Sequence, residues 1–191
     1  MMWASLFKAV GGLLLLVLLV LLIQAARQPD QFRVERKLQI QASPEALFAL
    51  IQDLRQFNRW NPYEKKDPQI QGQYSAQTAG PGARYAWQSK EVGEGSMEIT
   101  AQEAPQRVQM RLDFLKPFEA HNLAEFQIVA QPGGASEVSW SLSGPSPFIS
   151  KLMGVIFNMD RMIGRDFEAG LLNLKALAEA SPPAAAAAAQ K

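Results

Sequence analysis

The first pattern along the chain is an unbroken run of apolar residues that starts at Ala9 and ends at Ile23. As a helix, these 15 residues would extend about 22 Å, which is less than the hydrocarbon core of a bilayer, about 30 Å. Apolar neighbours on both sides bring the segment to spanning length. Because the run is apolar on every face, it does not suit the surface of a small soluble domain. The pattern therefore predicts a transmembrane helix within residues 1–27.

A cleaved signal peptide is the alternative for this segment, since a long apolar run is also typical of signal peptides. Cleavage requires small residues at two recognition positions, but the pairs available around Ala25 and Ala26 place Ile23 or Gln24 at one of them. The sequence thus favours a retained anchor. Basic residues after the run favour a cytoplasmic domain, whereas a short head before a long domain favours export. We predict a single-pass protein of the bacterial cytoplasmic membrane, with its soluble domain on the outer, periplasmic face.

After a linker at residues 28–31, the pattern changes to that of a strand. Apolar and polar residues alternate from Phe32 to Ile40, which predicts a strand buried on one face. The sequence Ser43-Pro44-Glu45 combines a cap, a proline and an acid, and so predicts the start of a helix. We expect two short helices there, the second ending at an Asn-Pro step.

The rest of the chain predicts a sheet followed by a long helix. Between residues 69 and 144, alternating segments are separated by turns rich in Gly and Pro, which is typical of an antiparallel sheet. From residue 146 to about 179, apolar residues recur at helical spacing, and we expect this stripe to pack across the concave face of the sheet. We therefore predict one α+β domain at residues 32–180. The Pro- and Ala-rich tail at residues 181–191 is of low complexity and has no predicted function.

This order of elements resembles the helix-grip fold. The segments VERKLQIQASPEALFALIQDL, FNRWNPY, RYAWQSKEVGEGSMEIT and MDRMIGRDFEAGLLNLK are similar to those of the SRPBCC superfamily, which includes START-type lipid-transfer domains and polyketide cyclases. The resemblance covers roughly residues 34–179 and is greatest to the bacterial branch that is similar to polyketide cyclases. It implies a curved antiparallel sheet of about seven strands that grips the long C-terminal helix, with a cavity between them for an apolar small molecule. It does not imply a chemical reaction, because the superfamily includes carriers, receptors, enzymes and interaction modules.

Strand alternation assigns side chains to the concave face of the predicted sheet. The candidate cavity residues come from the strands, from the second short helix and from the long helix: Trp60, Tyr74, Tyr85, Trp87, Met97, Met110, Leu112, Phe114, Phe126, Trp140, Met159, Ile163 and Phe167. Such residues are also typical of an ordinary packed core, so the expectation of a cavity comes from the resemblance. The strand residues assigned to this face include no carboxylate, histidine or lysine. This disfavours general acid–base catalysis and suits an apolar ligand.

Three polar features need separate interpretation. Arg36 falls in the inward register of the first strand, where it either contacts the acidic head group of a ligand or lies at a bulge. His121 is the only histidine, and we expect it in an outward position without a function. The charged pairs Asp160-Arg161 and Arg165-Asp166 are expected to form ion pairs at the surface of the long helix or between this helix and a loop.

Composition excludes several classes of function. The formal net charge is +1 and no cluster of basic and aromatic residues occurs, which argues against a nucleic-acid-binding protein. The absence of cysteine and the single histidine argue against a metal site. The chain has no phosphate-binding loop, nucleophile elbow or zinc-protease motif, and we expect no cofactor.

The sequence therefore predicts a membrane-tethered domain that binds or transfers a hydrophobic small molecule, such as a lipid, an isoprenoid or a polyketide-like compound. A cyclase or dehydratase is the first alternative. An interaction or stress-response module with a filled core and no ligand is the second. The oligomeric state is not predicted.

Overall fold

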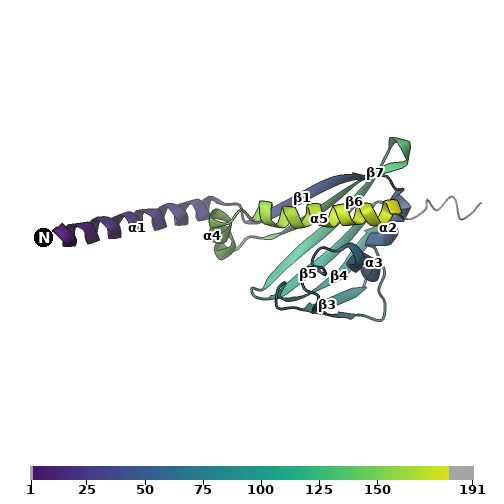
Figure 1. Ribbon diagram of the computed structural model, residues 1–191, viewed down its shortest axis with the longest axis horizontal. Coiled ribbons are helices and arrows are strands. Elements are labelled where there is room, and N and C mark those ends of the chain that lie inside the picture. Colours follow the sequence, from purple (N-terminus) through teal and green to yellow (C-terminus); the bar gives the residue numbers. More distant parts are fainter. Residues whose placement is uncertain (1, 181–191) are drawn as a thin grey trace, which may run out of the picture.

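The computed structural model describes residues 2–180, with side chains at residues 10–155 and 157–180, so the predicted tail at residues 181–191 lies outside the described residues. The fold is α+β, and its curved antiparallel sheet grips a long C-terminal helix, as predicted (Figure 1). In chain order the elements are α1 (Met2–Arg27), β1 (Gln31–Ile40), α2 (Pro44–Ile51), α3 (Leu54–Trp60), β2 (Gln71–Tyr74), β3 (Arg84–Gln88), β4 (Glu94–Glu103), β5 (Arg107–Lys116), β6 (Ala120–Gln131), η1 (Pro132–Gly134), β7 (Ala135–Pro145), α4 (Phe148–Ile156) and α5 (Met159–Ala180).

The seven strands form one sheet in the order β1-β7-β6-β5-β4-β3-β2. All the neighbours pair antiparallel, and β1 lies beside β7, with Gln31 opposite Pro145. The register therefore brings the start of β1, the end of β7 and the turns β3–β4 and β5–β6 to the same end of the sheet. We call this the proximal end, because α1 and α4 lie there (Figure 1). The opposite end is the distal end.

Helix α1 projects from the proximal end of the domain (Figure 1). Its segment Val10–Arg27, 18 residues long, is the one candidate membrane span among the described residues, and a signal sequence would have the same properties. Leucine and valine side chains are exposed along most of this segment, whereas Ala25, in its last turn, is buried. Helix α1 packs against α4 at this point.

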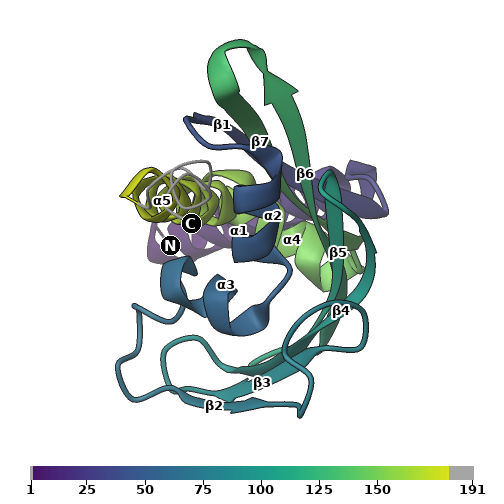
Figure 2. The same ribbon diagram turned by 90° about the vertical axis from the view of Figure 1, so that its right-hand side faces the viewer.

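Two short helices cover part of the concave face of the sheet (Figure 2). The Ser43 side chain accepts a hydrogen bond from the Ala46 amide at 3.3 Å and so caps α2, as the sequence predicts. Asp53 caps α3 in the same way, with Oδ1 2.8 Å from the Arg55 amide nitrogen. Both helices bury their apolar faces against the sheet and α5: Leu47, Phe48 and Ile51 from α2, and Leu54, Phe57 and Trp60 from α3.

The predicted single helix from residue 146 to about 179 is wrong in its N-terminal third. The structure divides it into α4 and α5, because Phe157 has extended backbone angles, with φ −114° and ψ 130°. The Asn158 side chain then accepts a hydrogen bond from the Arg161 amide at 2.8 Å, as a residue that caps a new helix does. An apolar stripe continues through both helices, which is why periodicity alone does not reveal the break.

The packing of α5 on the sheet requires a residue without a side chain at position 170. A Cβ atom there would lie 2.5 Å from Cζ3 of Trp140 and 3.0 Å from Cδ of Pro62. We expect Gly170→Ala to lower the free energy of unfolding by about 1–3 kcal/mol, since the added methyl group overpacks the interior. Thermal unfolding of the full-length chain, followed by near-UV circular dichroism, measures this change.

Gly154→Ala is the matched control, because a Cβ at Gly154 on α4 would have no heavy atom within 4 Å. There the gain in helix propensity, about 1 kcal/mol, is expected to act alone. Equal stability of the two variants would show that α5 does not depend on close contact at Gly170.

Candidate functional site

The strand residues assigned to the concave face from the sequence lie on one face of the sheet. The register places Met97 opposite both Tyr85 and Leu112 and places Phe126 opposite Trp140, so these side chains share one surface. Helix α5 crosses that surface and contacts β1 and β7. We call this surface, together with the side of α5 that faces it, the interior.

The central and distal part of the interior is filled by aromatic side chains. The rings of Trp140 and Phe167 stack, with centroids 4.1 Å apart and planes at 8°. Trp60 meets Phe126 edge to face at 5.8 Å, and its indole N–H donates a hydrogen bond to the Leu50 carbonyl at 3.0 Å. Such pairs add to the stability that burial provides. This part of the interior is therefore filled by the protein's own side chains.

The proximal part of the interior is less completely covered. Along β5, Met110 is buried, whereas Leu112 and Phe114 are only partly buried. The same trend is seen along α5: Phe167 is buried, whereas Met159, the first residue of α5 and the one nearest to α4 in the chain, is 38% exposed. Trp87 contacts Phe114 edge to face at 5.9 Å. Val34 and Leu142 stay buried near the proximal end, so the apolar side chains of the interior that reach solvent are those of β5 and of the start of α5.

A carboxylate lies at one edge of the interior, and the sequence did not predict it. Tyr85 donates a hydrogen bond from its hydroxyl to Oε1 of Glu64 at 2.5 Å. The Tyr85 ring leans over Gly72, where any side chain would clash with it. Glu64 lies in the loop between α3 and β2, and strand alternation cannot assign a direction to a loop residue. The turn signal Asn61-Pro62, which returns the chain toward the sheet, is the available clue in the sequence.

The second tyrosine of the candidate set lies next to Tyr85. The rings of Tyr74 and Tyr85 are 4.7 Å apart, and the Tyr74 hydroxyl accepts a hydrogen bond from Nδ2 of Asn58 at 2.8 Å. Burial raises the pKa of Tyr85, and the bond to Glu64 raises it further. The Tyr85 hydroxyl therefore stays protonated at neutral pH and acts as a hydrogen-bond donor at this edge.

Arg36 lies on the inward face of β1, as its register predicts, and its guanidinium group reaches α5. It forms ion pairs with Asp160 at 3.0 Å and Glu168 at 2.8 Å, and it donates to the Asp160 backbone carbonyl at 3.1 Å. Gly164 allows this approach, because a side chain there would overlap the guanidinium. Arg36 thus connects the first strand to α5 through its ion pairs and hydrogen bond. Contact with the head group of a ligand stays a prediction.

The predicted helix-surface pairs have partners outside α5. Asp160 pairs with Arg36 on β1, and Asp166 accepts a hydrogen bond from Lys66 at 2.7 Å. Both ion pairs join α5 to other elements. Their side chains are partly exposed to solvent, so each pair contributes little to stability by itself.

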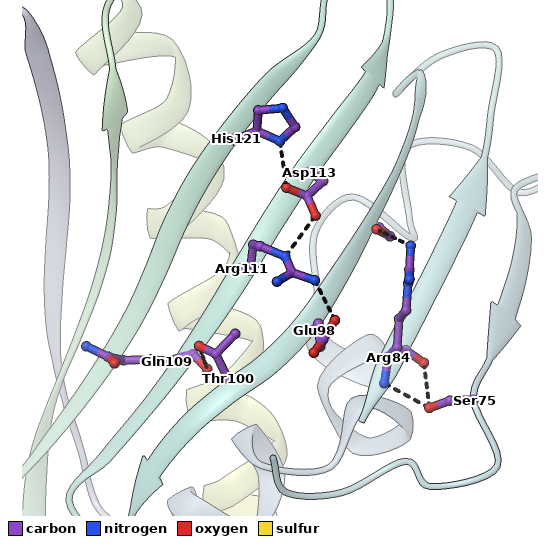
Figure 3. Close-up of polar contacts among 9 residues, drawn as sticks. Ser75, Arg84, Glu98, Thr100, Gln109, Arg111, Asp113 and His121 are labelled. Carbon is purple, nitrogen blue, oxygen red and sulfur yellow. Dashed lines mark hydrogen bonds and ion pairs between the residues drawn. The ribbon is translucent and has the colours of Figure 1, made fainter. Parts of the chain in front are cut away.

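The outer face of the sheet carries a polar network around His121 (Figure 3). Nδ1 of His121 lies 2.8 Å from Oδ1 of Asp113. Arg111 donates to the second oxygen of Asp113 at 3.0 Å and to Glu98 at 2.6 Å. A surface depression beside this network is lined by Gln31, Thr100, Arg111, His121, Asn122, Leu123, Ser143, Gly144 and Pro145.

A second depression lies beside the β4–β5 turn, among residues that include Pro44, Glu103 and Ile128. Neither of these two depressions lies between the sheet and α5. Within the described part of the chain, no group of three or more His, Asp or Glu side chains could hold a metal ion.

His121 provides a direct test of the outer network, because it is the only histidine and its ring signals need no assignment. The hydrogen bond that His121 donates to the Asp113 carboxylate raises the pKa of His121 above its ordinary value of 6.5. A raised pKa means that this contact stabilises the folded protein below about pH 6.5 and that the effect disappears as pH rises through the raised value. We expect Asp113→Asn to lower the pKa measured by NMR titration. Glu119→Gln should lower it less, because Glu119 lies 3.4 Å from the other ring nitrogen. An unchanged pKa in Asp113→Asn would contradict the contact.

Comparisons with known proteins bear on the fold and, separately, on the family. The chain matches no curated protein. Among solved structures, protein CV1439 from Chromobacterium violaceum superposes with a TM-score of 0.55 at 15% identity, covering 79% of this chain and 99% of that one. The Aha1 dimer from Colwellia psychrerythraea gives 0.53 at 16% identity, covering 78% and 96%. DynU16, from the dynemicin biosynthetic locus, gives 0.55 at 13% identity, covering 82% of this chain and 49% of that one.

These likenesses show the fold alone, whereas the family follows from the sequence. A family model described as polyketide cyclase/dehydrase and lipid transport matches residues 31–179, from the first strand to the end of α5. The match includes the strands that form the interior, the loop with Glu64 and the helix that carries Phe167. The chain therefore belongs to the polyketide cyclase/dehydrase and lipid transport family of the SRPBCC superfamily.

Proposed function

We propose that this protein is a membrane-tethered domain that binds a hydrophobic small molecule, such as a lipid, an isoprenoid or a polyketide-like compound, at the proximal part of its interior. The observation that carries the proposal is the change in burial along the interior. Distal side chains such as Trp60 and Phe126 are fully enclosed, whereas Leu112, Phe114 and Met159 are partly exposed. An apolar ligand would cover these groups and gain about 25 cal/mol for each Å² of apolar surface removed from water.

The chemistry of the proximal interior suits an apolar ligand. Its walls are leucine, isoleucine, methionine and aromatic side chains, and methionine adapts to ligands of different shape. The hydroxyls of Tyr74 and Tyr85 are polar groups at the edge of the interior, and they are engaged with Asn58 and Glu64. A few polar groups at the edge of an apolar site are typical of sites that orient a ligand.

The position of α1 supports a membrane tether. The helix is attached at the proximal end, where the interior is least covered (Figure 1). A ligand that partitions into the bilayer is concentrated there, and a tethered domain gains effective concentration without any new contact. In this proposal α1 is retained and the domain lies on the outer face of the membrane. The family description names lipid transport, which agrees with such a ligand.

Photolabelling tests the proposed site. The full-length chain in phosphatidylcholine nanodiscs is irradiated with a diazirine-bearing long-chain fatty acid, and the labelled peptides are identified by mass spectrometry. We expect adducts on β5 and on the first turns of α5. Leu112→Trp should remove most of them, because the larger ring fills the uncovered space beside Phe114.

Leu172→Trp is the control, because Leu172 is exposed on the solvent side of α5 and the same ring there fills no interior space. Adducts confined to α1 would refute ligand binding and would favour the interaction module with a filled core.

A cyclase or dehydratase is the second candidate, and the Tyr85–Glu64 pair favours it. Loss of water from a β-hydroxy ketone needs a base to remove the proton next to the carbonyl and an acid to protonate the leaving hydroxyl. Glu64 supplies a carboxylate and Tyr85 a hydroxyl that stays protonated, at 2.5 Å from each other. DynU16, whose fold is similar, comes from a biosynthetic locus.

The enzymatic candidate predicts that the full-length chain accelerates the loss of water from an aryl β-hydroxy ketone, measured by the absorbance of the conjugated product. Glu64→Gln should abolish the acceleration, because the amide cannot accept the proton. Glu119→Gln, a change at an exposed carboxylate of the β5–β6 turn, should leave it unaffected. A rate equal to that of buffer alone for the unmodified chain would argue against this chemistry.

A further inference from the structure

Helix α4 presents an exposed apolar surface at the proximal end of the domain. Phe148, Ile149 and Met153 on α4 and Phe157 directly after it are all exposed, with Ile149 at 60%. We call these four residues the α4 apolar face. Residues 149, 153 and 157 follow a spacing of four, so they lie along one side. Exposed apolar side chains are common singly, but a contiguous set on one helix indicates a surface that something covers.

The single charged residue of α4 does not interrupt this face. Lys151 is largely buried, and its ammonium group pairs with Asp30, in the connection between α1 and β1, at 2.6 Å. The one cation of the helix is thus turned toward the α1–β1 connection and neutralised there. The α4 apolar face remains without charge.

The position of α4 relative to α1 determines how deep α4 would lie in a bilayer that α1 crosses. The shielded part of the described α1 segment lies mainly in its last turns, where Leu21 and Leu22 are partly covered and Ala25 is buried. Since α4 packs against α1, it lies beside the C-terminal end of the candidate span Val10–Arg27. A span of this length, about 27 Å, ends close to the boundary of the hydrocarbon core when α1 crosses a bilayer. Helix α4 is then at the depth of the membrane interface.

A second apolar feature lies at the same end and belongs to the sheet. Phe118 lies in the β5–β6 turn and is 73% exposed, the highest value among the large apolar residues that the structure describes. The strand register places this turn at the proximal end, together with the end of β7 that leads into α4. The two features come from separate parts of the chain and lie at the end from which α1 extends.

We propose that the α4 apolar face and Phe118 insert into the interface of the bilayer that α1 spans, so that the proximal interior opens onto the membrane rather than into water. A helix of nine residues binds a bilayer weakly when it is free, but α1 holds this one at the surface, so that little additional affinity is needed. The inference rests on the membrane tether of the proposed function and adds the docking geometry. A ligand would then pass between lipid and interior without crossing water.

The absence of cysteine makes a precise test possible, because single-cysteine variants of the full-length chain carry one spin label each. The chain is reconstituted into phosphatidylcholine vesicles, and collisions of the label with oxygen and with a water-soluble nickel chelate are measured. Labels at Ile149→Cys and Phe118→Cys should show increased oxygen collisions and decreased nickel collisions relative to a label in water. Val129→Cys is the matched control, because Val129 is an apolar strand residue that is 52% exposed near the distal end. The label at this position should collide with oxygen and with the nickel chelate as a label in water does. Circular dichroism verifies that each variant is folded.

A label at Leu16→Cys, in the middle of α1, separates failure of this inference from failure of the tether. If Leu16 contacts lipid while Ile149 and Phe118 contact water, the tether stands and the docking is overturned. If all three contact water, the tether itself is wrong. If the Ile149 label is shielded from both reagents and its spectrum is broadened by a nearby second label, another copy of the chain covers the face, and the proposal is overturned in favour of a dimer. Photolabelling of the interior is a separate measurement and decides ligand binding independently.

Discussion

The close contact between α5 and the concave face of the sheet is the interaction on which the rest of this structure depends. Trp140 and Phe167 stack at 4.1 Å, and this approach exists because Gly170 has no side chain to separate helix and sheet. The stack joins β7 to the C-terminal helix, and α3 then closes over the same region with Phe57 and Trp60. Without this contact, the part of the sheet's apolar face that α5 covers would be exposed to water, and burial of apolar surface is the main source of stability.

The same contact explains why the two ends of the interior differ. The aromatic cluster and the two short helices occupy the central and distal part of the interior, so the side chains there are enclosed by rings that pack at edge-to-face and stacked angles. Toward the proximal end, α5 ends at Met159 and only α4 follows, turned toward α1. The fold therefore has a filled central and distal part, and it is less covered on β5 and at the start of α5, where apolar groups reach the surface. Parts of proteins that bind ligands are often drawn from the less stable regions of a fold, which agrees with the site that we propose there.

Polar contacts secure α5 at its rim rather than in its centre. Arg36 links β1 to Asp160 and Glu168, and Lys66 links the loop after α3 to Asp166. These groups remain partly solvated, so they determine the position of the helix more than they add to its stability. Tyr85 and Glu64 form a comparable contact at the opposite edge of the sheet, and there the polar pair adjoins the interior. The position of this one carboxylate is what leaves an enzymatic role open beside ligand binding.

The sequence by itself determined the class of fold, the order of its elements as far as the last strand, and the face of the sheet on which the candidate strand residues lie. These follow from local rules: a period of two places Tyr85, Met110 and Trp140 on one face, and Ser43 with Pro44 begins a helix wherever the chain goes afterwards. The family resemblance and the apolar N-terminal helix were also evident from residues alone. Only the tertiary structure decided the break between α4 and α5, the partners of Arg36, the approach of Glu64 to Tyr85 and the incomplete cover at the proximal end. Each of these depends on contacts between residues far apart in the chain, such as Arg36 and Glu168, and periodicity carries no information about which distant groups meet.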